Sequence, residues 1–210
     1  MPECLTVGTY NILKGINADR IIKNVAQMKQ QGVDILCLQE VHANARQPFI
    51  GDQIEACLGT TWGAVYFTGM RDPSRDHGLA TYWNKDTCTF DGMEIIDLPL
   101  LESLGPYEAL HSWHKSTTMR GALSVRMKIH ERMLKITNVH LDLLGGIRQR
   151  MRQFCFLQRF FSKLRIGYRE RLDHLFARGM QGEESRVLDL NGSDHYPLVC
   201  RLRFPEQLIC

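Results

Sequence analysis

The sequence lacks the features that mark several common classes of protein. It contains no apolar run of membrane-spanning length, no internal repeat and no low-complexity tract. The N-terminus shows no basic segment followed by an apolar one, so a cytoplasmic location is expected. The formal net charge of +3 is too small for the global basic character of a nucleic-acid coat protein. These absences favour a soluble, globular protein.

Cysteine pairs of the Cys-x-x-Cys type are also missing. The seven cysteines are scattered, with no zinc-site spacing, and their odd number favours free thiols in a reducing compartment. With 210 residues, 44% of them hydrophobic, the chain is long enough to bury a substantial core. No linker divides it, so we predict a single domain over residues 1–210.

Apolar patterning predicts a mixture of strands and helices. Residues 5–13 and 33–38 are typical of strands, and Asn17 is placed to cap a helix that continues to about Gln31. The second strand is continuously apolar and is predicted to be buried on both faces. Further helices are predicted at 52–58 and 147–163, and further strands at 64–68, 78–83, 87–96, 120–129, 133–141, 171–177, 186–190 and 198–202.

Polar groups suited to one site follow the ends of several predicted strands. Asn11, Glu40 and His140 each lie at or near the end of a strand-like run, and Asp194 and His195 lie on a Gly-Ser turn before the last strand. Ligands gather at the carboxyl ends of strands in α/β sheets. Each residue alone is explained more simply as a polar side chain meeting water. Their combination is what favours a functional site.

Six short motifs occur in the order typical of one superfamily. They are Tyr10-Asn11-Ile12-Leu13, Leu38-Gln39-Glu40-Val41, Arg120-Gly121, Asn138-Val139-His140-Leu141, Arg171-Leu172-Asp173-His174 and Ser193-Asp194-His195-Tyr196-Pro197-Leu198. Together they resemble the endonuclease/exonuclease/phosphatase superfamily, which includes pancreatic deoxyribonuclease, exonuclease III-type nucleases and neutral sphingomyelinases. The resemblance implies a four-layer α/β sandwich, with two mixed β-sheets face to face and helices outside. It also implies hydrolysis of a phosphoester with a divalent cation, Mg²⁺ or alternatively Mn²⁺.

The resemblance assigns roles to individual residues. Glu40 matches the metal-binding glutamate, with Asn11 beside it as a ligand or orienting group. Asp194 resembles the second acidic group near the metal. His195 matches the histidine that exchanges a proton during attack, and Asp173 matches the carboxylate that fixes its tautomer.

Two further residues are assigned to the substrate. His140 is similar to the superfamily's second histidine, on the leaving-group or phosphate side, and Arg120 is placed to hold a phosphate oxygen through its guanidinium. The substrate class stays open among nucleic acid, a phospholipid headgroup and small phosphoesters. No membrane span is expected, and we expect a monomer.

One motif of the superfamily is missing. A Gly-Asp-x-Asn motif normally lies between the strands that match 138–141 and 172–176, where its aspartate orients the attacking water and its asparagine holds the phosphate. Here only residues 164–170 separate the helix predicted at 147–163 from the strand predicted at 171–177. That connection is too short for another strand and a crossover. We therefore predict that a strand region has been deleted, whether naturally, by engineering or through a faulty gene model.

Three hypotheses follow from this departure. The first is a metal-dependent phosphoesterase impaired by the deletion. The second is a non-catalytic relative that keeps the cleft as a phosphate-binding surface, and the third is a defective fragment without a selected role. Retention of Glu40, Asp173, Asp194 and His195 favours the first hypothesis, whereas the missing motif favours the others. Magnesium-dependent cleavage of a generic phosphodiester separates them.

Overall fold

The computed structural model describes residues 4–42, 49–67, 77–98, 121–140 and 180–204. These residues form two β-sheets, two α-helices and one 3₁₀ turn. The helical segments are η1 (Leu13–Gly15), α1 (Ala18–Gln30) and α2 (Ile50–Leu58). The strands are β1 (Cys4–Asn11), β2 (Ile35–His42), β3 (Trp62–Phe67), β4 (His77–Asn84), β5 (Thr89–Asp97), β6 (Gly121–Ile129), β7 (Arg132–Val139), β8 (Gln181–Val187) and β9 (Leu198–Arg203).

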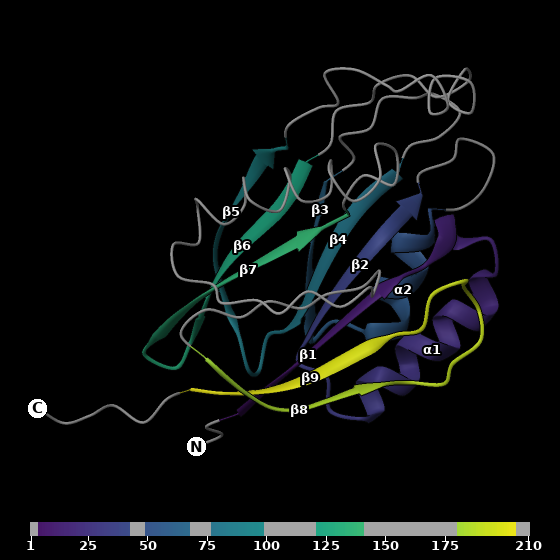
Figure 1. Ribbon diagram of the computed structural model, residues 1–210. Coiled ribbons are helices and arrows are strands. Elements are labelled where there is room, and N and C mark those ends of the chain that lie inside the picture. The colour runs from purple at the N-terminus through teal and green to yellow at the C-terminus, as the bar shows by residue number, and fades with distance from the viewer. Residues whose placement is uncertain (1–3, 43–48, 68–76, 99–120, 141–179, 205–210) are drawn as a thin grey trace, which may run out of the picture.

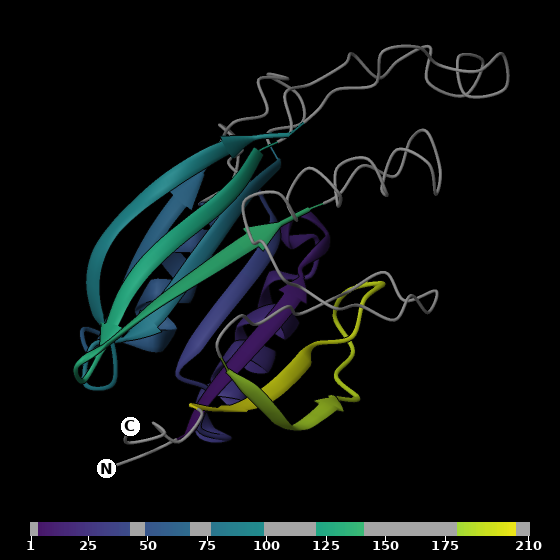
Figure 2. The ribbon, with the colours of Figure 1, turned by 60° about the vertical axis from the view of Figure 1, so that its left-hand side comes forward.

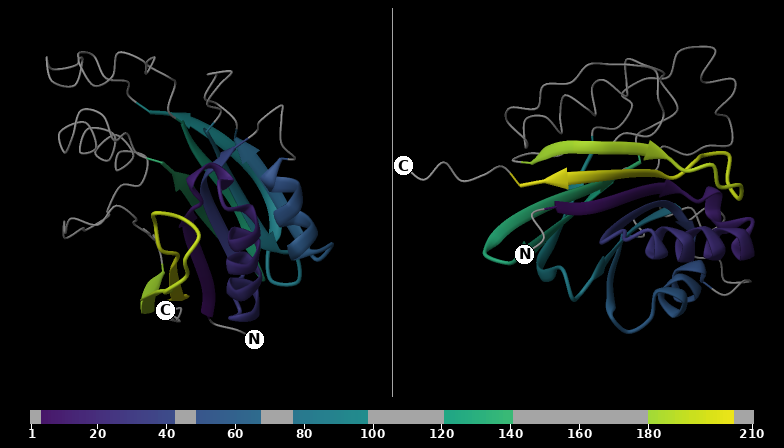
Figure 3. Two further views of the ribbon diagram at one scale, coloured as in Figure 1. Left: turned by 90° about the vertical axis from the view of Figure 1, so that its right-hand side faces the viewer. Right: turned by 90° about the horizontal axis from the view of Figure 1, so that it is seen from below.

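The described elements stack in three layers. A six-stranded sheet of order β3-β4-β2-β1-β9-β8 carries α1 and α2 on one face and packs against the three-stranded sheet β5-β6-β7 on the other (Figures 1 and 3). One buried cluster joins the helices to the large sheet, and a second lies between the sheets. The fold is therefore an α/β sandwich. The helix predicted at 147–163 lies outside the described residues.

The pairing of strands brings the predicted site residues to one end of the large sheet. β1 and β2 are parallel, joined through α1, with Asn11 beside Gln39 in register. All other described pairs in that sheet are antiparallel. The described strands of the smaller sheet pair in antiparallel fashion. Because β1 and β2 run in the same direction, their carboxyl ends meet.

Three local predictions differ from the structure. β2 continues past the predicted end to His42, and β8 covers Gln181–Val187 rather than 186–190. Every residue of β8 is exposed, so it carries no buried alternation from which its bounds could be read. Asn17 precedes α1 but makes no side-chain capping bond, and only its backbone carbonyl accepts a hydrogen bond, from Ile21. The strand predicted at 171–177 lies outside the described residues.

Five of the seven cysteines and two α-helices lie in the described residues. The described cysteines are all free thiols: Cys4, Cys37, Cys57, Cys88 and Cys200. Cys37 and Cys88 are buried, so they act as small core side chains. In the described part of the chain, neither helix is long and apolar enough to cross a membrane.

We expect the free energy of unfolding to fall as the pH rises above 9.0. Burial raises the pKa of the Cys37 thiol from 9.0 to about 12, and burial together with the charge of Asp34 raises the pKa of Cys88 from 9.0 to about 12. The unfolded chain releases these protons at lower pH than the folded chain. Between the two pKa values, stability should therefore fall by about 1.4 kcal/mol per pH unit for each thiol.

Urea unfolding across this pH range measures the effect. The Cys37→Ala/Cys88→Ala double variant should show a shallower decline, because both thiols are then absent from the folded and unfolded chains. A residual decline is expected from buried Tyr82, whose pKa is also raised by burial. Equal slopes for the two proteins would contradict the prediction.

Candidate functional site

Residues from both sheets meet at one end of the sandwich. The arrowheads of β1, β2 and β7 point toward this end, where the loop that precedes β9 also lies (Figures 1 and 2). Residues at the ends of these strands can therefore contact one another although they are far apart in the sequence. We call this region the strand-end site and define it by Asn11, Glu40, His140, Asp194 and His195.

Asn11 at the end of β1 orients Glu40. Its Nδ2 donates a hydrogen bond to Glu40 Oε1 at 3.1 Å, and its Oδ1 accepts one from the backbone N–H of Leu13 at 3.0 Å. The side chain is buried, so neither bond competes with bulk water. The Leu13 donor fixes which end of the amide faces Glu40, and Asn11 consequently presents its N–H group to the carboxylate.

Glu40 reaches this position through a bulge in β2. In the pairing of β2 with β4, Gln39 lies opposite Leu79 and Val41 lies opposite Gly78, so Glu40 is the extra residue. Its φ is +56°, a left-handed conformation that is uncommon for residues other than glycine. Regular alternation would direct Glu40 to the helix-covered face, where Val41 now packs. The bulge instead directs the carboxylate toward Asn11 and β7.

His140 brings the smaller sheet into the site. It follows β7, and its Nε2 lies 3.7 Å from Glu40 Oε1. This distance is too long for a strong hydrogen bond but close enough for a charge interaction when the imidazole is protonated. The side chains are 23% exposed for His140 and 15% exposed for Glu40, so both groups are partly shielded from solvent while remaining accessible.

The Asp194-His195 turn is tied directly to Asn11. The hydroxyl of Ser193 donates to the backbone carbonyl of Asn11 at 2.7 Å, and the backbone N–H of His195 donates to the Ser193 hydroxyl at 3.2 Å. Ser193 Oγ also lies 3.1 Å from Asp194 Oδ1. The Asp194 side chain is 61% exposed, whereas that of His195 is only 17% exposed. The turn thus holds a sheltered imidazole beside an accessible carboxylate.

A second anchor joins this turn to α1. Asn24 Nδ2 donates to the Tyr10 hydroxyl at 3.2 Å and to the Asn191 carbonyl at 3.1 Å. Gly192 has a φ of +152°, and a Cβ there would lie 3.1 Å from Asn24 Nδ2, so the close approach requires glycine. Burial raises the pKa of the Tyr10 hydroxyl; the Asn24 hydrogen bond opposes this shift and the Asp194 charge adds to it.

The structure describes five of the seven predicted site residues. Asn11 and Glu40 are in contact, His140 lies beside Glu40, and the turn carrying Asp194 and His195 is bonded to Asn11. Arg120 and Asp173 lie outside the described residues, so their roles stay predictions. The sequence analysis assigned no role to Ser193, Asn24, Gln39 or Asn138. Ser193, Gln39 and Asn138 each had a local signal, because each lies in a quoted motif within two residues of a predicted site residue, whereas Asn24 had none.

The donor set is suited to magnesium rather than to a metal that needs several soft or nitrogen ligands. Among the described residues, no group of three or more His, Cys, Asp or Glu side chains is placed to hold a metal ion. Mg²⁺ usually binds through one or two carboxylates, completed by water and substrate phosphate. Glu40 and Asp194 offer such carboxylates at one end of the sandwich, so the residues present fit this ion.

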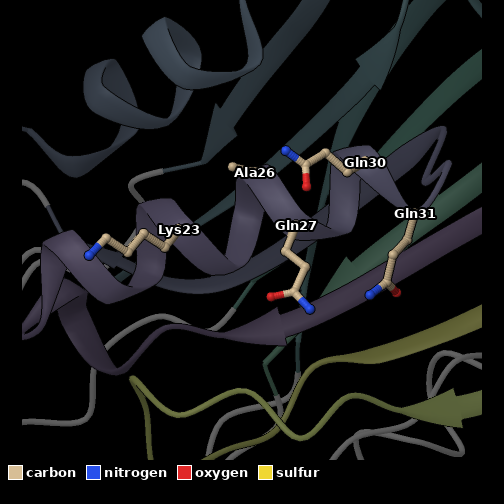
Figure 4. Close-up of a pocket in the computed structure, with 5 residues that line it drawn as sticks. All are labelled: Lys23, Ala26, Gln27, Gln30 and Gln31. Atoms are coloured by element: carbon tan, nitrogen blue, oxygen red, sulfur yellow. The ribbon is translucent and has the colours of Figure 1, made fainter.

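A surface hollow on α1 offers no comparable chemistry. Figure 4 shows its lining, all from one helix: Lys23, Ala26, Gln27, Gln30 and Gln31. It contains one cation and several amides but no carboxylate or imidazole. It therefore lacks the acid–base groups that the strand-end site combines.

The fold is similar to that of known structures, although no protein-family model and no curated protein sequence matches the chain. An endonuclease/exonuclease/phosphatase family protein from Bacteroides thetaiotaomicron is 14% identical, with a TM-score of 0.71 over 98% of this chain and 99% of that chain. The human Nocturnin catalytic domain with bound sulfate is 17% identical, with a TM-score of 0.64 over 96% of this chain and 94% of that chain. D. rerio TDP2 complexed with single strand DNA product is 12% identical, with a TM-score of 0.64 over 96% and 100%.

Proposed function

We propose that this chain, which has the endonuclease/exonuclease/phosphatase fold, is a phosphoesterase that works with Mg²⁺, or alternatively Mn²⁺, at the strand-end site. The observation that carries the proposal is the contact between Asn11, Glu40 and His140, which come from three strands in two sheets. The bulge in β2 turns the Glu40 carboxylate toward the His140 imidazole. This left-handed conformation costs free energy, so folding alone explains the bulge poorly.

Each side chain has a definite task in this proposal. Glu40 and Asp194 would hold the cation, and Asn11 keeps the Glu40 carboxylate turned toward the strand-end site. When bound, Mg²⁺ supplies positive charge beside the phosphoryl oxygens. His195 exchanges a proton during attack by water, with Asp173 on its far nitrogen, and this arrangement is the usual support for an acid–base histidine.

His140 and Arg120 complete the substrate side of the proposal. His140 faces the leaving group or a phosphate oxygen, and Arg120 holds a second phosphate oxygen with its planar guanidinium. A phosphodiester in nucleic acid is the substrate class that we favour. This choice is supported by D. rerio TDP2, which has the same fold and is known with a single strand DNA product.

The missing Gly-Asp-x-Asn motif supports a second function. Without the aspartate that orients water, the same cleft would bind phosphate groups without efficient hydrolysis. The arrangement of Glu40 and His140 serves either function, because both need a cation and a phosphate at this place. Turnover of a simple phosphodiester separates the two.

Glu40→Gln is expected to weaken Mg²⁺ binding while leaving the fold intact. The glutamine keeps an oxygen that accepts from Asn11, but it removes the negative charge that the cation needs. Asn11→Ala, which removes only the orienting bond, should lower Mg²⁺ affinity by about 10- to 100-fold, and Glu40→Gln should lower it further. Calorimetric titration of the full chain with Mg²⁺ and Mn²⁺ measures both effects.

The matched control is Glu131→Gln, at an exposed glutamate that pairs with Lys128 at the β6–β7 turn. It should leave both the titration and the rate of bis-p-nitrophenyl phosphate hydrolysis unchanged. If Glu40→Gln binds Mg²⁺ as tightly as the unmodified chain does, Glu40 is not a ligand of the ion. Absence of any Mg²⁺- or Mn²⁺-dependent hydrolysis by the unmodified chain would leave the phosphate-binding alternative.

A further inference from the structure

We propose that Gln39 and Asn138 are positioning residues whose buried hydrogen bond holds Glu40 and His140 at their working separation. The inference rests on the proposed function, because Glu40 and His140 belong to that site. We call the pair the inter-sheet bridge: Gln39 lies in β2 of the large sheet and Asn138 lies in β7 of the small one.

The inter-sheet bridge is a direct contact between the sheets. Gln39 Nε2 donates to Asn138 Oδ1 at 2.8 Å, and the two side chains are only 5% and 2% exposed. Asn138 Nδ2 in turn donates to the carbonyls of Leu38 and Ala80, each at 2.9 Å. A single asparagine from the small sheet therefore contacts two neighbouring strands of the large sheet, β2 and β4.

The bonding pattern allows only one orientation of the two amides. Because the Asn138 amide nitrogen already donates to two carbonyls, its oxygen must accept, and Gln39 must therefore donate through Nε2. Gln39 Nε2 also lies 2.9 Å from Thr9 Oγ1 in β1. Its Oε1 is buried and has no hydrogen-bond partner among the residues that the structure describes. Replacing two hydrogen-bonded amides by apolar side chains of similar shape can be nearly neutral for stability, so the stability of the core alone does not explain why two amides meet here.

The inter-sheet bridge lies directly beneath the two groups that it aligns. Glu40 follows Gln39 in the chain at the bulge of β2, and His140 follows Asn138 by two residues. Asn138 and His140 extend from the same face of their strand, so the hydrogen bond and the Glu40–His140 contact of 3.7 Å are adjacent links between the sheets. If the hydrogen bond between Gln39 and Asn138 is lost, the distance between Glu40 and His140 can increase.

The test compares two single variants with their combination. Gln39→Leu leaves Asn138 Oδ1 without the donor of the inter-sheet bridge, and Asn138→Leu leaves Gln39 Nε2 without that acceptor. The Gln39→Leu/Asn138→Leu double variant replaces both side chains with apolar groups of similar size. All three should lower kcat for bis-p-nitrophenyl phosphate with Mg²⁺ by about 10²-fold, the loss typical of an ångström-scale misplacement. KM should change by less than about threefold. The unfolding temperature should be higher in the double variant than in either single variant, whereas kcat should stay low.

Ser124→Ala is the matched control for a lost buried hydrogen bond. Ser124 is fully buried in β6 and its hydroxyl lies 2.9 Å from Thr137 Oγ1, on the opposite face of the same small sheet. The variant should lower the unfolding temperature without changing kcat. If the double variant regains both stability and kcat, the inter-sheet bridge is only structural and the inference fails.

A measurement that does not depend on catalysis tests the positioning role separately from the proposed function. Crystal structures of the unmodified chain and the double variant give the distance from Glu40 Oε1 to His140 Nε2, which should widen by about 1 Å or more in the variant. In the same double variant, the affinity for Mn²⁺, measured by electron paramagnetic resonance, should fall. An unmodified chain without hydrolytic activity would overturn the phosphoesterase, whereas an unchanged Glu40–His140 distance would overturn the positioning role.

Discussion

His195→Ala is expected to lower the rate of phosphodiester hydrolysis by about 10²- to 10⁴-fold, the usual contribution of a positioned acid–base group. The imidazole is sheltered on a turn that is bonded through Ser193 to the carbonyl of Asn11. This anchoring holds it next to the residues proposed to bind the cation, where a proton can be exchanged with the attacking water or the leaving group. Steady-state hydrolysis of bis-p-nitrophenyl phosphate with Mg²⁺ measures the loss.

Two further variants sharpen this prediction. His130→Asn replaces an exposed histidine of the β6–β7 turn, where φ is +54° and asparagine is tolerated, so it should leave the rate unchanged. Asp173→Asn should lower the rate if Asp173 fixes the tautomer of His195. That pairing requires the two side chains to lie within about 3.5 Å in a crystal structure, or to share a bridging water. A His195→Ala protein with the full rate would remove His195 from the mechanism.

Inserting the segment that we predict to be missing is expected to raise the rate of hydrolysis by about 10²- to 10³-fold, the typical effect of a positioning or electrostatic group in a catalytic site. The insertion would place a strand and a Gly-Asp-x-Asn loop between Lys163 and Arg171. Its aspartate would orient the attacking water and its asparagine would hold the phosphate, two tasks for which the chain has no matching motif. Single-turnover rates before and after the insertion give the comparison.

The control for this experiment is an insertion of the same length with Gly-Ala-x-Ala in place of the motif. It separates the chemistry of the two side chains from any general effect of lengthening the chain, and it should give no increase in rate. Efficient turnover by the 210-residue chain as it stands, abolished by His195→Ala, would mean that another group orients the water. The deletion would then have no catalytic consequence.

The sequence alone located several strands and the polar residues near their ends, but not the residues at which the strands end. Continuous apolar patterning identified β2 as a strand buried on both faces, and polar residues directly after apolar runs identified Asn11, Glu40 and His140. Strand alternation and burial are local properties, so they can be read from neighbouring residues. The order of the short motifs then favoured a fold that known structures share with this chain.

The direction of the Glu40 side chain was decided only by the tertiary structure. Alternation along Leu38-Gln39-Glu40-Val41 places Glu40 on the helix-covered face, and no residue in this segment marks the bulge. The bulge becomes visible only in the pairing with β4, where Glu40 has no opposite residue. A bulge depends on the partner strand, which the local sequence does not specify.

The same limit applies to the contacts that hold the site together. The hydrogen bond between Gln39 and Asn138 joins residues 99 positions apart, and the bond from Ser193 to Asn11 joins residues 182 positions apart. Such bonds form because two sheets pack face to face and because β9 pairs beside β1. Local propensity carries no information about either arrangement, so the residue types that line the site were predictable and their mutual geometry was not.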